Sequence, residues 1–389
     1  MPWTEATKMS LRKEFVRLAN REETNMAELC RRYGISRKTG YKWLRRWQEA
    51  GDAGLDDRSR RPHHSPRRTP RAVEEQVLRV YSAYPAWGGR KLRARMERMV
   101  AEGRLSLTCD PIPAANTITR ILRRYDVWES HSLGAPESPA TQRFERPEPN
   151  DLWQVDFKGE FLLENQQRCY PLTVVDDHSR YDVGLRSCSD IQRLTVQAEF
   201  TTLFRRYGLP RALLIDHGPP WGSGTVPAAS RPVYTRLHVW WLRLGIHVIY
   251  ARPFHPQTKG KNERFNGTLQ AELLRYESFR DGAHAQERFD WWRDQYNNER
   301  PHQALDDAVP ADRYTPSPRP FPPELPPIEY GPDDTVRKVD KAGKISWHGT
   351  PYRVGKAFAG FPVAVRPQTA PRTWRVYFCQ HAIRKIEVE

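Results

Sequence analysis

Three acidic residues, each in a different predicted element, restrict the folds open to this chain. Asp156 lies inside the short apolar run 152–157, and Asp216 ends the apolar run 212–216, which a Gly-Pro turn follows. Glu263 lies in the first turn of a predicted helix that begins after a proline-containing loop. The three positions are separated by 60 and 47 residues. A fold that brings them to one point would offer Mg²⁺ or Mn²⁺ the hard oxygen ligands that these ions prefer.

The predicted Glu263 helix combines an apolar face with a charged beginning. Lys259 and Lys261 flank Glu263, and a carboxylate among cations at a loop-to-helix junction is suited to holding a metal near a polyanion. A charged first turn is, however, more often only a solvated face. The residues predicted to form the buried face recur at helical spacing: Phe265, Leu269, Leu273 and Leu274.

Longer stretches around these acids resemble the retroviral-integrase-like DDE transposases, and most closely the bacterial insertion-sequence transposases of the IS481 type. The chain departs from that family at His217, where many relatives carry Asn. The interval from Asp216 to Glu263 is also longer than in retroviral integrases, and an insertion around 222–236 would explain it. The matching stretches are 153–156 (Trp-Gln-Val-Asp), 174–181, 215–218, 255–265 and 296–305.

The resemblance implies an RNase H-like α/β catalytic core over residues 151–305. It implies that Asp156, Asp216 and Glu263 are catalytic and hold two Mg²⁺ or Mn²⁺ ions, with Asp156 between them. Lys259 and Lys261 would neutralise phosphate, although each could equally be a surface lysine. His217 is a candidate modulator that could hydrogen-bond to Asp216 or to a phosphate oxygen.

Residues 8–50 are predicted to form a helix-turn-helix domain that binds DNA. Asn25 and Ser36 stand where they can cap the second and third helices, and Gly34 begins the turn between these helices. The second helix of such a pair enters the major groove. We expect Tyr41, Leu44 and Trp47 to pack inward. An ordinary basic helical hairpin is the alternative. The cations expected to face DNA are Arg37, Lys38, Lys42, Arg45 and Arg46.

A second helical or winged DNA-binding unit is predicted over residues 71–128, with Asn116 or Thr117 capping its last helix. Residues 51–70 read as a basic linker, which could lie along a groove or be a solvated tether, and 129–150 as a second linker. The exposed cations of the last helix would be Arg120, Arg123 and Arg124.

Antiparallel strands followed by alternating helices and strands are expected in the core. The Pro-rich residues 306–334 read as a connector. Short alternating apolar runs over 335–389 predict a small β-barrel, and the resemblance makes it SH3-like. This barrel could serve packing or oligomerisation, or it could contact DNA. The expected core elements are strands at 152–158, 161–163, 169–176, 212–216 and 246–250, and helices at 195–207, 234–244 and 289–296, the last with Trp291 and Trp292 packing inward.

Charge favours a nucleic-acid partner. The net charge is +16, and residues 1–150 carry 30 Lys and Arg against 19 Asp and Glu. The expected partner is double-stranded DNA, both element terminal repeats and target DNA, bound by a homo-oligomer. No apolar run approaches about 20 residues, so no membrane partner is expected. Five scattered cysteines imply neither a disulfide framework nor structural zinc, which fits a bacterial cytoplasmic protein, nucleoid-associated when bound to DNA.

Three functions are consistent with the sequence. The first is a transposase that cleaves element ends by metal-dependent hydrolysis and joins the 3′-hydroxyls to target DNA by transesterification. The second is a helix-turn-helix regulator or a catalytically degenerate transposase, against which the intact Asp/Asp/Glu set argues. The third is a plain RNase H-like nuclease, which would not need two sequence readers.

Overall fold

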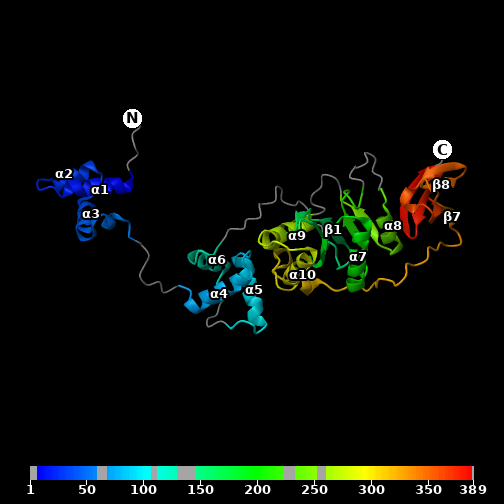
Figure 1. The fold of residues 1–389 in the computed structure, drawn as a ribbon, viewed down its shortest axis with the longest axis horizontal. Helices are drawn as coiled ribbons and strands as arrows, with labels where there is room; N and C mark the ends of the chain where they lie inside the picture. The colour runs from blue at the N-terminus through cyan, green and yellow to red at the C-terminus, as the bar shows by residue number, and fades with distance from the viewer. Residues whose placement is uncertain are drawn as a thin grey trace, which may run out of the picture. The chain divides into compact units, whose positions relative to one another are not determined.

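The chain forms two compact units, residues 1–68 (the N-terminal unit) and residues 69–389 (the core unit). The computed structural model describes residues 7–58, 68–106, 112–128, 145–222, 233–251 and 260–387. Figure 1 shows the helices and strands of both units along the chain. No helix in these described ranges combines the length and the apolar character that crossing a membrane requires.

The N-terminal unit has the helix, turn and helix that the sequence predicts. Its helices are α1 (Lys8–Ala19), α2 (Met26–Arg32) and α3 (Arg37–Ala50), followed by the short 3₁₀ helix η1 (Gly51–Leu55). The Asn25 side chain accepts hydrogen bonds from the amides of Ala27 and Glu28, and Ser36 accepts one from Thr39. Both predicted N-caps are therefore confirmed.

The buried face of α3 differs from the predicted one. Trp43 is buried and Tyr41 is 55 % exposed, so the prediction that Tyr41 packs inward was wrong. Gly40 sets this rotation, because a Cβ at this position would lie 2.6 Å from the Cys30 sulfur and 2.9 Å from the Phe15 ring. Close approach at Gly40 turns Trp43 toward the small core and leaves Tyr41 facing outward.

The core unit begins with three helices, α4 (Arg71–Ala83), α5 (Gly89–Ala101) and α6 (Ala115–Arg124), which share one apolar cluster. Helix α6 starts at Ala115 without a side-chain cap, so the prediction of Asn116 or Thr117 as its cap was wrong. No strand occurs among the described residues of 68–128, which gives the predicted wing no support.

A six-stranded mixed sheet forms the centre of the core unit. Strand β3 pairs antiparallel with β1, β2 and β4, whereas β1, β5 and β6 are parallel, so that β1 is flanked by β3 and β5. This order agrees with the expected RNase H-like core. The strands are β1 (Trp153–Phe157), β2 (Phe161–Leu162), β3 (Arg168–Asp176), β4 (Asp182–Cys188), β5 (Ala212–Ile215) and β6 (His247–Tyr250).

Helices cover both faces of this sheet. Helices α7 (Arg193–Tyr207) and α8 (Arg236–Arg243) pack on one face. The other face is covered by α9 (Gly260–Leu269), its continuation η3 (Gln270–Leu274, a π-helical turn) and α10 (Gly282–Asn298). In Figure 1, β1 lies between α7 and the α9–α10 pair. Side chains alternate along β1, which directs Trp153 and Val155 toward α7 and Asp156 toward α9.

The C-terminal residues form a β-rich region with its own apolar cluster. One sheet has the order β12-β11-β10-β7, and β8 and β9 form a separate hairpin. The region therefore has the predicted alternating strands. Its strands are β7 (Thr335–Lys338), β8 (Lys344–Trp347), β9 (Thr350–Arg353), β10 (Pro362–Pro367), β11 (Thr373–Phe378) and β12 (His381–Glu387), with the 3₁₀ helix η6 (Lys356–Phe358) between β9 and β10.

The Pro-rich connector lies against the core and is not a free tether. It contains the 3₁₀ helix η5 (Pro310–Arg313) and is preceded by a shorter one, η4 (Gln303–Leu305). Tyr314 stacks on Tyr181 with ring centroids 4.1 Å apart, and Arg319 donates to the carbonyl of Leu244 at 2.8 Å. These contacts hold the connector along the sheet.

Candidate active site

Asp156 lies near the carboxyl end of β1, and Asp216 directly follows the neighbouring strand β5. Strands β1 and β5 run parallel, with Trp153 opposite Leu213 and Gln154 opposite Leu214. The same offset of 60 residues separates Asp156 from Asp216, so this register, continued by two residues, places the two acids side by side. Neighbouring strands are about 4.8 Å apart. Both acids are partly exposed, which suits them to a ligand arriving from solvent.

Helix α9 contacts Asp156 directly. The Asn266 side-chain amide donates to Oδ2 of Asp156 at 3.0 Å. One turn earlier, the side-chain Oδ1 of Asn262 accepts a hydrogen bond from the Thr173 hydroxyl at 3.1 Å, which ties the helix to β3. These two amides fix the first turns of α9 against the sheet. Sequence reasoning missed both asparagines, although their four-residue spacing placed them on one helical face.

Glu263 is exposed and lies three residues before Asn266, on the adjoining part of the same helical face. Its helix position is therefore next to the side chain that holds Asp156. Within the described ranges, no three His, Cys, Asp or Glu side chains are gathered closely enough to hold a metal ion. The structure thus places two of the predicted acids side by side and the third on the adjacent helix, without an assembled three-carboxylate cluster.

The donor set nevertheless fits a hard divalent cation. All three groups are carboxylates, Asp156 and Asp216 are partly exposed and Glu263 is exposed. Mg²⁺ and Mn²⁺ favour such oxygen donors and usually retain several waters, so they do not require a closed protein cage.

The segment after β5 turns sharply at Asp216. The Asp216 Oδ1 atom accepts a hydrogen bond from the Gly218 amide at 2.9 Å, which closes the turn. His217 stacks on Tyr250 with ring centroids 4.8 Å apart, and its Nε2 lies 3.1 Å from the Ala251 carbonyl oxygen. Because a carbonyl oxygen only accepts, Nε2 carries the proton. His217 is thus held by the neighbouring strand β6.

Lys261, which was predicted to neutralise phosphate, pairs with a buried acid of the core unit. Its Nζ lies 2.7 Å from Asp177 Oδ2 and also donates to the Asp177 carbonyl oxygen at 2.8 Å. Burial and the nearby Arg180 lower the pKa of Lys261 to about 8, although Asp177 opposes this effect. Lys261 is therefore a partly buried cation whose charge is paired with Asp177. Lys259 lies outside the described residues.

The acids next to the site in sequence are structural. Asp176 and Asp177 are fully buried. Asp176 accepts from the amides of Asn150 and Ser179, at 2.7 and 2.8 Å, and Asp177 accepts from the Gln154 side chain at 2.8 Å. Both acids fix the turn between β3 and β4, and neither lies exposed beside Asp156.

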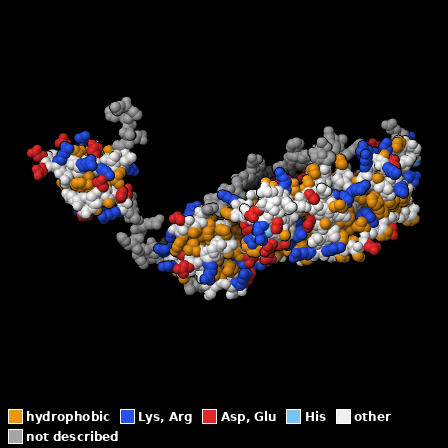
Figure 2. All heavy atoms as spheres, in the orientation of Figure 1, with side chains coloured by type: hydrophobic (Ala, Val, Ile, Leu, Met, Phe, Trp, Pro, Cys, Tyr) orange, Lys and Arg blue, Asp and Glu red, His pale blue; other side chains and the backbone are white. Residues whose placement is uncertain are grey.

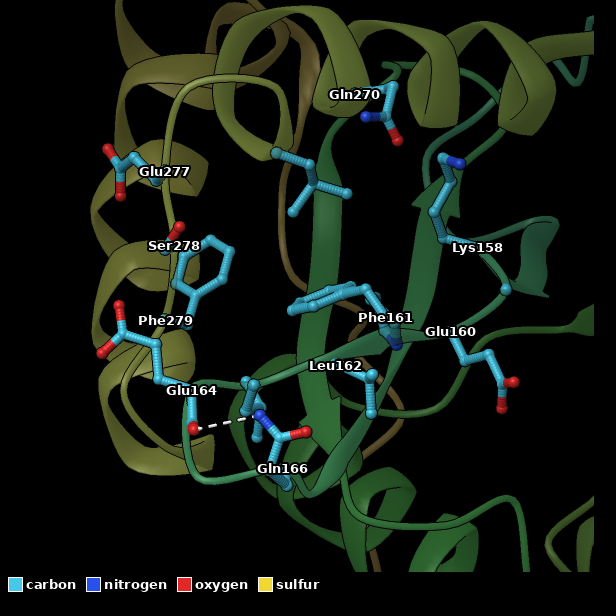
Figure 3. A pocket seen from close by; sticks show the side chains of 14 residues that line it. Lys158, Glu160, Phe161, Leu162, Glu164, Gln166, Gln270, Glu277, Ser278 and Phe279 are labelled. Carbon is cyan, nitrogen blue, oxygen red and sulfur yellow. Dashed lines mark hydrogen bonds between the residues drawn. The ribbon is translucent and has the colours of Figure 1, made fainter.

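A hollow of ≈ 410 Å³ lies beside this site and does not include the three acids. It is bordered by Lys158, which directly follows β1, and by Gln270, which directly follows α9. Figure 3 shows Gln270 on the helix, Lys158 on the strand side and the Phe161 ring facing Phe279. The two rings are 5.4 Å apart. The hollow is thus a depression with aromatic rings inside and charged and polar side chains around them, next to the ends of the two site elements.

The predicted DNA-facing cations separate into exposed and engaged groups. Lys42 and Arg46 lie over the Trp43 ring, at 4.3 and 5.2 Å from its centroid. Arg124 pairs with the buried Glu74 and therefore has a structural role. In Figure 2, Lys and Arg side chains are spread over the drawn face together with acidic ones. The predicted cations that remain exposed without such contacts on a ring or buried acid are Arg37, Lys38, Arg45, Arg120 and Arg123.

Family comparisons assign the segments of the chain in order. Residues 11–63 match a helix-turn-helix domain and 39–122 a homeodomain-like domain. Residues 146–256 and 244–310 match two integrase core domain families. Residues 334–389 match the C-terminal domain of the IS481 family transposases.

Two relatives of this chain are proteins of insertion elements. The insertion element IS407 uncharacterized 31.7 kDa protein of Burkholderia multivorans is 30 % identical over 164 residues, which is 42 % of this chain and 55 % of that protein. The insertion element IS476 uncharacterized 39.2 kDa protein of Xanthomonas euvesicatoria is 34 % identical over 168 residues, 42 % of this chain and 44 % of that protein. The chain thus spans about half the length of these relatives.

Among solved structures, a chain of the simian T-cell lymphotropic virus intasome in complex with PP2A regulatory subunit B56 gamma covers 80 % of this chain and 99 % of its own length. The TM-score is 0.37 and the identity 15 %, so the fold assignment rests on the sheet order and the family matches. The matches thus follow one another along the chain as helix-turn-helix segments first, integrase core domains next and the C-terminal domain of the IS481 family transposases last.

Proposed function

We propose that this protein is a DNA transposase that cleaves insertion-sequence ends by metal-dependent hydrolysis and joins the resulting 3′-hydroxyls to target DNA by transesterification. The observation that carries this proposal is the parallel register of β1 and β5, which brings Asp156 beside Asp216 next to the helix that bears Glu263. The match of this region to integrase core domains supports it.

In this proposal Asp156, Asp216 and Glu263 hold two Mg²⁺ or Mn²⁺ ions. Such a pair of ions activates the attacking oxygen and stabilises the leaving oxygen of an in-line displacement. Asn266 orients Asp156 through its 3.0 Å hydrogen bond. His217, held on Tyr250, keeps the turn after Asp216 in place and modulates the site without entering the chemistry.

The N-terminal unit and residues 71–128 recognise the element ends in this proposal. Arg37, Lys38 and Arg45 contact DNA from α3, and Arg120 and Arg123 contact it from α6. The C-terminal β-rich region is an SH3-like barrel in this proposal. Terminal-repeat DNA and target DNA are the partners, and a homo-oligomer assembles on them in the bacterial cytoplasm, at the nucleoid.

The test is strand transfer of a labelled, pre-cut element end into plasmid DNA by the full chain. Each of Asp156→Asn, Asp216→Asn and Glu263→Gln keeps side-chain shape and removes a charge, so each should reduce hydrolysis and joining about 10³-fold or more, while end binding persists. Activity should require Mg²⁺ or Mn²⁺, and Ca²⁺ should not support chemistry because its coordination is larger and looser.

The matched control is Glu287→Gln, because Glu287 is likewise an exposed glutamate on a helix, α10. Asp176, Asp177 and Glu272 are unsuitable controls, since their carboxylates are buried in hydrogen-bond networks. If the Glu263→Gln protein joins ends at the parental rate, the third metal ligand must be a residue other than Glu263. If the parent protein binds a verified end specifically but never cleaves or joins it, the DNA-binding regulator replaces the transposase.

A further inference from the structure

A buried carboxylate links α5 to the far end of the helix that bears Glu263. Glu272 lies in the π-helical turn η3, and its side chain is 8 % exposed. Lys91 Nζ of α5 lies 3.1 Å from Glu272 Oε1, and Arg300 Nε, just after α10, lies 3.0 and 3.1 Å from the two carboxylate oxygens. Glu272 is therefore held by cations from two other parts of the core unit.

The first turns of the α9–η3 helix, residues 260–274, are tied to the sheet by Asn262 and Asn266, whereas its far end is held through Glu272. Phe265, Leu269 and Leu273 pack in the apolar cluster beneath the sheet. Apolar packing is not directional, so it limits the rotation of a short helix only loosely. Hydrogen bonds from charged donors to Glu272 are directional, and they fix the rotation of the far end of the helix, beyond the turns held by Asn262 and Asn266. A helix rises 1.5 Å per residue, so Glu263 lies on the order of 13 Å from this anchor.

The other ion pairs between α5 and the core do not touch this helix. Arg98 binds Asp312 with two bonds of 2.7 and 3.2 Å, and Arg95 binds Glu299 at 2.8 Å. Among the described residues, Lys91 is therefore the α5 cation whose ion pair reaches the α9–η3 helix. Replacing Arg98 should therefore perturb only the docking of α5, whereas replacing Lys91 should also perturb the helix that bears Glu263.

We propose that Glu272 is a positioning residue for the candidate active site, and that Lys91 makes the placement of Glu263 depend on the docking of residues 71–128 on the core. The proposal rests on the proposed function, because it assigns the consequence to Glu263. Residues 71–128, which are expected to bind element ends, would thereby hold the helix that bears Glu263. Binding of an end and the geometry of the site would then be linked.

The test compares Lys91→Met with Arg98→Met in the full chain. Both changes remove an α5 cation from the same interface, and only the first affects Glu272. Three quantities are measured: Mn²⁺ binding by calorimetry without DNA, hydrogen exchange of the amides of 260–274, and joining of a pre-cut end. Lys91→Met should weaken Mn²⁺ binding and joining about tenfold and speed exchange in 260–274, with end binding unchanged. Arg98→Met should leave all three near parental values.

Lys91→Arg keeps the cation and should restore Mn²⁺ binding and joining. If Lys91→Met does not fold, Lys91→Gln takes its place with the same expectations. Unchanged Mn²⁺ binding and exchange in the folded Lys91 variant would overturn the positioning role, and so would equal losses in Arg98→Met. If the parent protein joins no verified end, the proposed function fails, whereas calorimetry and exchange still decide the role of Lys91 and Glu272.

Discussion

At the scale of single residues, Asp182 is a buried acid whose titration bears on stability. It begins β4, is fully buried, and has Arg293 Nε 4.0 Å from its Oδ1. Burial raises the pKa of Asp182 to about 7, and Arg293 and the Gly184 amide oppose that rise only in part. An unfolded chain releases this proton near pH 4.

The pH dependence of stability follows from this difference. Between about pH 4 and pH 7 the folded chain holds a proton that the unfolded chain has released, so unfolding free energy falls as pH rises through that window. Asp182→Asn removes the titration and should raise the unfolding free energy at pH 8 by a few kcal/mol, on the order of 1.4 kcal/mol per pKa unit.

Urea unfolding of the full chain at pH 5 and pH 8 measures this effect. The Asp182→Asn protein should lose less stability between the two pH values than the parent. Glu164→Gln, an exposed turn residue, is the control and should follow the parent curve. An equal loss in Asp182→Asn and the parent would show that Asp182 is already ionised at pH 5.

At the scale of elements, helix α3 presents its cations on two different faces. Arg45 is exposed and pairs only loosely with Glu49 at 3.7 Å, whereas Arg46 lies over the Trp43 ring. Arg45→Gln should therefore weaken binding to element ends and reduce the slope of log affinity against log salt by about one. Arg46→Gln should leave that slope near its parental value and lower the stability of the N-terminal unit.

Affinity titrations of a fluorescent end duplex at several salt concentrations distinguish the two arginines. Thermal unfolding of each variant supplies the second readout. A larger change of salt slope in Arg46→Gln than in Arg45→Gln would mean that Arg46 leaves Trp43 to contact phosphate, which would reverse the assignment of the faces.

Individual elements show which features of the fold could be predicted from the sequence and which could not. Two helix caps and one turn follow local rules, and the structure places Asn25, Ser36 and the turn after Asp216 as expected. Strand β4 was missed because Asp182, Arg186 and Ser187 interrupt its apolar pattern. Their partners come from helices packed on the sheet: α10 accepts from the amides of Asp182 and Ser187, and Glu199 of α7 pairs with Arg186.

Local sequence rules also could not predict which of several similar faces of a helix is buried. Aromatic residues at 41, 43 and 47 fit more than one face of α3, and the close approach at Gly40 selected Trp43. Likewise Trp291 is 43 % exposed while Trp292 is buried, although both were expected to pack. The binding of Lys261 to Asp177, 84 residues earlier, could not be read from charge near Glu263.

At the scale of the whole molecule, α8 belongs to two apolar clusters at once. Leu237, Trp240 and Trp241 pack with the sheet of the core, whereas Val239 and Leu242 pack with the C-terminal strands. Leu242→Ala should therefore destabilise the core unit by about 2–5 kcal/mol, as for other buried leucines. It should also speed hydrogen exchange in both β11 and β5.

Hydrogen exchange followed by mass spectrometry tests this linkage. Exposed Leu194→Ala on α7 is the control and should leave both strands unchanged. Faster exchange in β11 alone would show that the C-terminal region opens independently, and the shared helix would then not couple the two clusters.

The double membership of α8 also bears on how such proteins can be recombined. A natural or engineered exchange of the last domain between relatives would be expected to break at the Pro-rich connector, which precedes residues 334–389. Here that cut would separate the new C-terminal strands from Val239 and Leu242, which lie almost 100 residues upstream. Functional hybrids should therefore take the α8 face with Val239 and Leu242 from the same parent as the C-terminal domain. Substitutions in these two parts of the sequence should occur together among relatives.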